Sequence, residues 1–378
     1  MTRITIQPDR FPYLMVPTQD LDAESLLQQA LTLSQMGDYR SAIAHFSQVL
    51  ELRPDNLEAW SEKASALVNL GQHESALNCL DKALMAHPTS PYLQYQHGWV
   101  AHVAGQYDLA ITSFRRVIQL QPNYPNAHYG LGLALYISGL SEEAIPYLAK
   151  ALDLNATSAE IWYLQGAALY ATGRYEGAIT HLNRSLEIRP DNAEALSSRG
   201  NALLCLGDYE AAVSSYAQAL AIDVEDPQVW YHRGFAMKQL NRHEAAIECY
   251  QKAVKLHPDY AMAWYGLGFS QMRQEQFDNA ANSFERVLTL QPDYYEAWYN
   301  RGVVLKLLNR LEEALMSYDR ALELRSDDYR AWNNRGGLLV SLGQLEAALQ
   351  SFDRVLRLRP DDAIAIKNRA AVLRKLQQ

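Results

Sequence analysis

The sequence predicts an all-α solenoid of ten helix-turn-helix repeats, because three features recur at a fixed spacing of 34 residues. An alanine occupies ten successive grid positions, a small residue stands 12 residues before each alanine, and a proline closes most of the units. The alanines are Ala42, Ala76, Ala110, Ala144, Ala178, Ala212, Ala246, Ala280, Ala314 and Ala348. A period of this length indicates stacked supersecondary units rather than several separate globular domains.

Each unit shows two amphipathic patterns, which we call helix A and helix B, and its 34 positions are numbered as places. In the unit at 159–192, apolar residues at helical spacing from Ile161 onward predict helix A. Gly173 interrupts this pattern, as a glycine just after a helix does. A second stripe from Ala178 predicts helix B, and Pro190 prevents its continuation. Because neither helix buries its stripe alone, the units must stack.

The grid orders the elements along the chain. Residues 1–22 form an N-terminal arm, which either packs on the repeats as an intramolecular ligand or is a disordered tail. The ten units follow at 23–56, 57–90, 91–124, 125–158, 159–192, 193–226, 227–260, 261–294, 295–328 and 329–362. Residues 363–378 form a capping helix, whose charged side chains suit an end that faces solvent.

Small and aromatic places predict the core. Gly or Ala at place 8 and Ala at place 20 let helices A and B approach closely, and a larger side chain there would cost roughly 1–3 kcal/mol. Rings at places 4 and 24 fill the remaining volume. Place 4 holds Trp60, Trp162, Trp230, Trp264, Trp298 and Trp332, and place 24 holds Phe46, Phe114, Tyr216, Tyr250, Phe284, Tyr318 and Phe352.

Four residues depart from the pattern near helix ends. Asn241 and Asn309 replace the glycine between helices A and B, and asparagine tolerates the left-handed backbone. Glu275 stands at the equivalent place and predicts a local difference in turn geometry. Pro146 is expected in the first turn of a helix B, where proline costs little.

The repeat length and the order Trp, Gly, Ala, aromatic residue and Pro within a unit closely resemble the tetratricopeptide repeat (TPR) family. The resemblance covers residues 23–362 as ten ungapped units. It implies a right-handed superhelix whose A helices line a concave groove. The style of the units, such as Tyr-Asn-Arg-Gly at 299–302, resembles bacterial members. The motif is specific for the fold and says little about function.

In this family, ligands usually contact places 2, 5, 6, 9, 12 and 13 of helix A. Transferred to this sequence, these places imply a partner-binding groove formed by Tyr95, Trp99, Tyr129, Tyr136, Tyr163, Tyr170, Tyr231, Tyr265, Tyr299, Asn300, Lys306 and Asn334. The groove gains Lys238, Arg273 and Lys306 toward the C-terminus. Tyrosine offers a large contact area at low entropic cost. The alternative, that tyrosine at place 5 is ordinary structural filler, stays open.

A chaperone-type carboxylate clamp is incomplete in every unit. Such a clamp needs Lys at place 5 and Asn at place 9, followed by Asn in the next unit. Asn201 stands at a ninth place, but Ser197 replaces the lysine and His232 the following asparagine. The sequence therefore argues against binding of a chaperone EEVD tail.

Two polar series run through the C-terminal repeats. Place 6 holds Asn300, Asn334 and Asn368, and place 7 holds Arg199, Arg233, Arg301, Arg335 and Arg369. The asparagines resemble a short ladder of the kind that grips an extended peptide backbone. The arginines are compatible with an anion-binding stripe, but structural ion pairing is the favoured interpretation, because acidic residues lie near them in sequence.

Composition and motifs argue against several classes of function. A net charge of -9 argues against a nucleic-acid partner. No apolar run reaches the roughly 18 residues of a membrane span. Nucleophile-elbow, phosphate-loop and zinc-protease motifs are absent, so no catalytic site or cofactor is expected. Scattered histidines and three cysteines argue against a metal site, and the scarcity of cysteine favours a reducing, cytoplasmic compartment.

These observations favour a non-enzymatic scaffold or assembly factor that binds protein or peptide segments in its groove. The alternative is a regulatory or targeting subunit of a separate enzyme. A third class, an RNA-binding helical repeat, is disfavoured by the acidic charge and by the 34-residue register. The partner and the oligomeric state are not encoded in any motif of the sequence.

Overall fold

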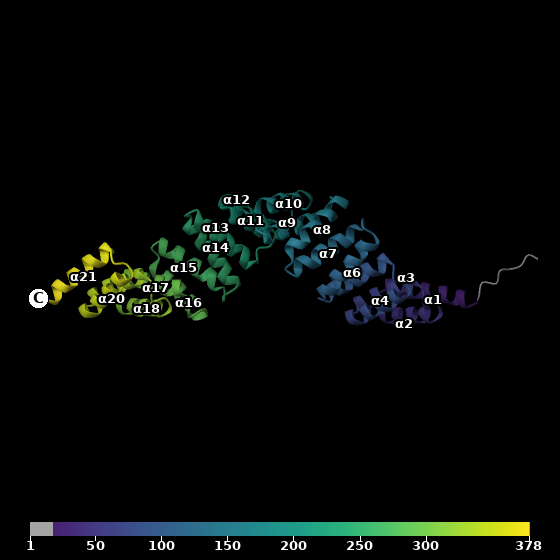
Figure 1. Cartoon of the computed structure of the whole chain (residues 1–378), viewed down its shortest axis with the longest axis horizontal. Helices are drawn as coiled ribbons and strands as arrows, with labels where there is room; N and C mark the ends of the chain where they lie inside the picture. Colours follow the sequence, from purple (N-terminus) through teal and green to yellow (C-terminus); the bar gives the residue numbers. More distant parts are fainter. Residues whose placement is uncertain (1–17, 378) are drawn as a thin grey trace, which may run out of the picture. The chain divides into compact units, whose positions relative to one another are not determined.

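A computed structural model describes residues 18–377, and within this range every regular element is an α-helix, 21 in all (Figure 1). The predicted arm falls largely outside the described residues, because only the last few positions of 1–22 are described, as the start of the first helix at Thr18. The chain forms two compact units that divide between Ile188 and Arg189. In both, the all-α solenoid of helix pairs is confirmed.

The N-terminal unit contains five helix pairs. They are α1 (Thr18–Gln35), α2 (Tyr39–Leu52), α3 (Leu57–Asn69), α4 (His73–Ala86), α5 (Pro91–Val103), α6 (Tyr107–Leu120), α7 (Pro125–Ile137), α8 (Ser141–Leu154), α9 (Ala159–Ala171) and α10 (Tyr175–Ile188). Odd-numbered helices are A helices and even-numbered helices are B helices. Each A helix except α3, which packs equally on α2 and α4, packs most extensively on the B helix that follows it.

The C-terminal unit contains five further pairs and a last, unpaired helix. They are α11 (Ala193–Leu206), α12 (Tyr209–Ile222), α13 (Pro227–Gln239), α14 (His243–Leu256), α15 (Ala261–Arg273), α16 (Phe277–Leu290), α17 (Tyr295–Leu307), α18 (Leu311–Leu324), α19 (Tyr329–Ser341), α20 (Leu345–Leu358) and α21 (Ala363–Leu376). The last helix packs on α20 and leaves Ile364 and Ile366 exposed.

Within each unit, successive A helices approach one another directly, as α3 approaches α5 and α13 approaches α15. Among the described residues, successive B helices make no such approach. Because the A helices lie close together and the B helices lie further apart, the A helices form the inner side of each unit. We call the surface formed by the A helices the A-helix face, and the opposite surface the B-helix face.

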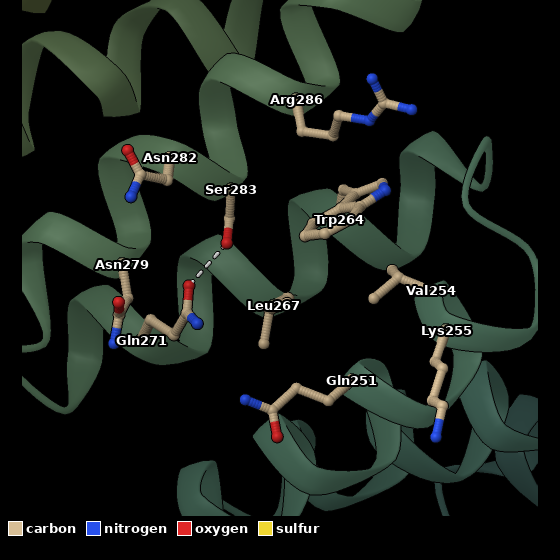
Figure 2. A pocket seen from close by; sticks show the side chains of 10 residues that line it. All are labelled: Gln251, Val254, Lys255, Trp264, Leu267, Gln271, Asn279, Asn282, Ser283 and Arg286. Atoms are coloured by element: carbon tan, nitrogen blue, oxygen red, sulfur yellow. Dashed lines mark hydrogen bonds between the residues drawn. The ribbon is translucent and has the colours of Figure 1, made fainter.

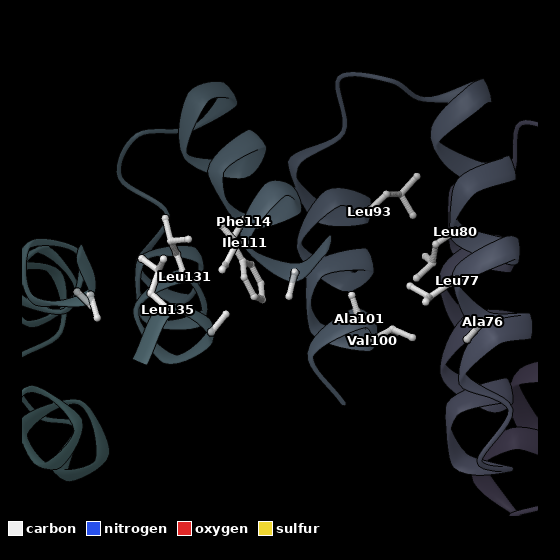
Figure 3. Packing of buried hydrophobic residues seen from close by; sticks show 14 of the residues in the cluster. Ala76, Leu77, Leu80, Leu93, Val100, Ala101, Ile111, Phe114, Leu131 and Leu135 are labelled. Carbon is white, nitrogen blue, oxygen red and sulfur yellow. The ribbon is translucent and has the colours of Figure 1, made fainter. Parts of the chain in front are cut away.

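The small residue at place 8 is required by a side chain at place 24. A Cβ atom added to Gly98 would lie 2.9 Å from the ring of Phe114, and one added to Gly130, on the next A helix, 2.7 Å from it. The fully buried Phe114 ring therefore joins α5, α6 and α7, and Figure 3 shows it among Ile111, Leu131 and their neighbours. The predicted close approach is confirmed, and its cause is a shared aromatic ring.

The place-4 tryptophans were expected in the core, but all six are only half-buried. Their indole Nε1–H donates to the carbonyl oxygen six residues earlier, at 2.8 Å from Trp264 to Pro258 and 2.9 Å from Trp332 to Ser326. The same bond joins Trp60 to Pro54, Trp162 to Ala156, Trp230 to Val224 and Trp298 to Pro292. Each ring thus fastens its helix to the turn before it, and its position is set by a polar contact as well as by packing.

Pro146 lies inside α8, beyond its first turn, so the expectation of a first-turn position was wrong. Proline removes one amide donor from the helical ladder, yet α8 continues to Leu154. Ala144 and Leu148, on either side, are fully buried. Packing of this buried stripe holds the helix together across the missing bond.

Glu275 has a φ of 59°, close to the 57° of Asn241 and the 59° of Asn309, so the expected difference in turn geometry was wrong. A non-glycine residue in this left-handed region costs about 1–2 kcal/mol.

We therefore expect Glu275→Gly to stabilise the protein by about 1 kcal/mol, after allowing for the greater freedom of glycine in the unfolded chain. Urea unfolding followed by circular dichroism measures the change. Glu275→Ala is the control, since it removes the same charge but keeps the backbone strain. Equal midpoints for the glycine and alanine variants would show that strain is not the cause.

Candidate binding face

The predicted tyrosines at place 5 lie on the A-helix face, but each is half-buried rather than projecting. The Tyr95 ring packs against Phe114, with centroids 5.9 Å apart, and against Tyr124, 5.3 Å away. Tyr265 contacts Phe284 and Tyr294 in the same manner, at 5.9 and 5.2 Å. Burial raises the pKa of Tyr265 to about 12. These tyrosines form the floor of the face, where each ring packs on its neighbours and is partly exposed, and their contact with a partner stays a prediction.

Asn300 and Asn334 are not a free ladder. The Nδ2 group of Asn300 donates to the hydroxyl of Tyr265 at 3.1 Å, and that of Asn334 donates to Tyr299, also at 3.1 Å. Each bond joins place 6 of one unit to place 5 of the unit before it. The amides therefore set the orientation of the tyrosine hydroxyls and link neighbouring A helices.

A hollow of about 450 Å³ opens on the A-helix face between α3 and α5. Its walls are largely apolar, with Val68 on one side and Tyr95, Trp99 and Val103 on the other. The Trp99 indole is 37% exposed and stacks on the Tyr95 ring, with centroids 6.5 Å apart and planes 16° apart. The structure thus brings two predicted residues, Tyr95 and Trp99, into one concave site.

One edge of this hollow carries a hydrogen-bond network. Gln96 donates through Nε2 to Ser61 Oγ at 2.7 Å and to the Tyr92 hydroxyl at 3.2 Å. Its other amide atom, Oε1, is buried and accepts no hydrogen bond from the described residues. Sequence reasoning missed this group because glutamine at place 6 has no motif of its own. The hollow therefore offers an apolar wall beside a fixed polar edge.

The other predicted tyrosines are spread along the face. Tyr129 and Tyr136 lie on α7, where they pack on the core, and burial raises the pKa of Tyr129. The remaining pair on α9 is Tyr163 and Tyr170, and the Tyr170 ring lies 5.7 Å from that of Tyr175. All four are half-buried. None lines the hollow between α3 and α5.

In the C-terminal unit, the Lys238 ammonium lies 4.5 Å from the Phe235 ring centroid and 5.6 Å from that of Phe269. Tyr231, one helical turn before Phe235, packs on Tyr250 and Tyr260, and its ring centroid lies 6.0 and 5.0 Å from theirs.

Two further predicted residues, Tyr299 and Lys306, lie on α17, and Lys306 is exposed. Neither belongs to a concave site among the described residues.

The predicted structural role is confirmed for four place-7 arginines, Arg199, Arg301, Arg335 and Arg369, which bond to B helices, whereas Arg233 lies over the ring of Trp230. Arg301 donates to Ser317 Oγ at 2.9 Å, and its guanidinium lies 3.6 Å from Glu285. Arg335 donates to Ser351 and to the carboxylate of Asp319. The serine bonds join helix A to helix B of the same repeat, and the carboxylates come from helix B of the preceding repeat, so these arginines are not an open anion-binding stripe.

The unit at 261–294 has Leu267 at place 7, and a second hollow of about 630 Å³ opens there on the B-helix face (Figure 2). The short Ser283 side chain at its edge donates to Gln271 Oε1 at 2.7 Å. Trp264 and Leu267 form its apolar floor, and side-chain amides and two cations surround it.

Residues 18–377 contain neither a metal-binding cluster nor a helix suited to cross a membrane. No three His, Cys, Asp or Glu side chains gather closely enough to hold a metal ion in this range. None of the helices there combines the length and apolar character needed to span a membrane. The candidate sites are therefore the two hollows and the aromatic-basic area around Lys238.

Solved structures share the repeat architecture with this chain. The YrrB crystal structure, described as a TPR protein with an unusual peptide-binding site, is 24% identical, covering 49% of this chain and 95% of that one, with a TM-score of 0.46. A MamA fragment from Desulfovibrio magneticus RS-1 is 28% identical over 45% and 96% of the two chains, with a TM-score of 0.43. The Cut9–Hcn1 tetramer of the APC/C matches at 13% identity over 96% and 97%, with a TM-score of 0.43.

Comparison with curated proteins gave no match. Profiles of the repeat family, in contrast, match most of the chain. Tetratricopeptide repeat profiles match residues 33–95, 125–158, 270–328 and 308–363, and a TPR repeat profile matches 101–139, 166–207, 200–241 and 238–275. The same repeats carry the helix pairs, the place-8 contacts and the A-helix face described above. The chain belongs to the tetratricopeptide repeat family.

Proposed function

We propose that this chain is a non-enzymatic interaction scaffold or assembly factor, which binds a peptide segment of a partner protein on its A-helix face. The observation that carries the proposal is the hollow between α3 and α5, where a large indole stays 37% exposed beside apolar walls. Aromatic residues in concave, partly desolvated sites supply most of the binding energy in protein interfaces. The hollow has room for one or two apolar side chains of a peptide.

The polar edge supports a peptide rather than a purely apolar ligand. The side-chain amides of Gln96 and Asn69 line the hollow and offer hydrogen-bond partners to the backbone of a bound segment. Gln96 is held in place by Ser61 and Tyr92. A fixed side-chain amide beside an apolar wall recognises the two features that every peptide carries: backbone amides and side chains.

Trp99→Ala tests the proposal. Peptides selected from a random phage-displayed library on the full-length protein are expected to be rich in aromatic and aliphatic residues. Labelled copies should bind Trp99→Ala at least about tenfold more weakly than the parent in fluorescence anisotropy, because truncating an aromatic anchor commonly costs 2 kcal/mol or more.

Met85→Ala is the matched control, since Met85 is 85% exposed on α4, in the same compact N-terminal unit as Trp99. It removes a similar apolar side chain outside the hollow. Equal affinity of the selected peptides for the two variants would rule out this site.

A further inference from the structure

Lys238 is a half-buried cation without an anionic partner. Its ammonium lies against the rings of Phe235 and Phe269, and burial lowers its pKa. Among residues 18–377, no carboxylate lies within ion-pair distance of its nitrogen. Aromatic faces attract a cation but accept its hydrogen bonds only weakly. The three N–H donors of this ammonium therefore lack strong acceptors in the protein.

Two further basic groups lie at the same place. Arg273, at the end of α15, is exposed and forms no ion pair within the described part of the chain. His243, the first residue of α14, is 9% exposed, and its ring lies 6.5 Å from that of Phe269. Its Nδ1 atom is buried without a hydrogen-bond partner. The pKa of His243 is lowered first by burial and then by the positive charges of Arg273 and Lys238.

Elsewhere in the C-terminal unit, two half-buried arginines on A helices lie beside carboxylates. Arg301 lies near Glu285 and Glu313, and Arg335 pairs with Asp319. Lys238 is different, because its ammonium faces two aromatic rings instead of carboxylates, and a second cation, Arg273, acts on the same neighbour, His243. In a chain with a net charge of -9, this arrangement is not a consequence of general basicity.

We propose that Lys238, Arg273 and His243, with Phe235 and Phe269 as walls, bind the carboxylate side chains of an acidic peptide segment. The inference rests on the proposed function, since it names the charge of a segment lying on the A-helix face. Lys238 and Arg273 donate charge-assisted hydrogen bonds to the carboxylates, and the buried His243 ring packs beside Phe269. The aromatic walls exclude water and strengthen these bonds.

A protein segment fits the cluster better than a nucleic acid. Nucleic-acid binding draws on many phosphate contacts along a basic surface. Here Lys238 lies against two rings with His243 beside one of them, and Lys306 stands two repeats beyond Lys238 on the same face. Such a site matches one or two carboxylates flanked by apolar side chains, which a short acidic peptide supplies.

The test selects peptides from a random phage-displayed library on the full-length parent protein. We expect Asp and Glu to be enriched among the selected sequences. Labelled peptides should bind the variant Lys238→Gln/Arg273→Gln at least about tenfold more weakly than the parent, as loss of two charge-assisted contacts implies. Their affinity for the parent should also fall with added salt.

Lys252→Gln/Arg357→Gln is the matched control, because both side chains are exposed on B helices of the C-terminal unit and the same charge is removed. Equal loss in the control and the test variant, or selected peptides without acidic residues, overturns the proposal. If the double variant unfolds at a lower temperature than the parent, the single variant Arg273→Gln replaces it in the binding test, because Arg273 is exposed. Peptides that depend on Trp99 but not on Lys238 would overturn this inference and leave the proposed function standing, whereas failure to select any peptide overturns both.

Discussion

Raising the pH above about 10 is expected to unfold the C-terminal unit, while the N-terminal unit resists. The cause lies at place 24, where the C-terminal unit has the fully buried Tyr216, Tyr250 and Tyr318. The equivalent side chains of the N-terminal unit are Phe46, Leu80, Phe114, Leu148 and Leu182, none of which ionises. Burial raises the pKa of Tyr250 and Tyr318 far above the ordinary value.

The sign follows from proton release. Below about pH 10 these tyrosines are neutral in both states, and their titration contributes nothing to stability. Above it, a tyrosine in the unfolded chain loses its proton while the buried one keeps it, so rising pH favours unfolding. Each such group lowers the free energy of unfolding by about 1.4 kcal/mol per pH unit. Tyr250 and Tyr318 together therefore lower it by about 3 kcal/mol for each pH unit above about 10.

Circular dichroism and the near-ultraviolet absorbance of tyrosinate, recorded together during an alkaline titration, measure this effect. Loss of helix should coincide with a step in ionisation. Tyr250→Phe/Tyr318→Phe is expected to shift the transition to higher pH. Tyrosinate absorbance that rises fully while the helices stay intact would contradict the expectation. Tyr250→Phe carries a second benefit, because the buried Tyr250 hydroxyl has no hydrogen-bond partner among the described residues.

Phe114→Ala is expected to destabilise the N-terminal unit by about 3–5 kcal/mol, the range for truncating a fully buried phenylalanine. The ring fills the space between Gly98 and Gly130, and neither glycine carries a side chain that could fill the cavity. It also supports the Tyr95 ring from below. Urea unfolding of the variant measures the loss.

Phe114→Leu is the control, because it keeps most of the volume and should cost less than about 1.5 kcal/mol. Peptide binding adds a second readout. If Phe114→Ala leaves the unit folded at low temperature, the loss of support under Tyr95 should still weaken peptides that depend on Trp99. Similar stabilities for the alanine and leucine variants would show that the site collapses around the missing ring.

The helices could be predicted from the sequence because their signals are local. Each place-8 glycine and each place-20 alanine marks a contact that every unit repeats, so the register alone determines which helices pair. The depth of a side chain is different, since it depends on residues in the next unit. The half-buried position of Tyr265, for example, comes from the ring of Tyr294 and the amide of Asn300.

The candidate site could be predicted only in part, for the same reason. The family places identified the A-helix face and included both Tyr95 and Trp99. They could not show that Trp99 stays exposed beside a hollow, because the opposite wall comes from α3. His243 was missed altogether, since it belongs to helix B and joins Lys238 only through the fold. A periodic pattern predicts which residues lie on one face of a helix, but not which side chains of other helices contact them.

The indole bonds to the preceding turn bear on how such a repeat tolerates sequence drift. The accepting atom is a backbone carbonyl, and it belongs to Pro258 in one unit but to Ala156, Val224 or Ser326 in others. Every residue type supplies that oxygen equally well. The closing proline is therefore replaced in three repeats of this chain without loss of the indole hydrogen bond. The sequence constraint lies instead on the tryptophan that donates this bond.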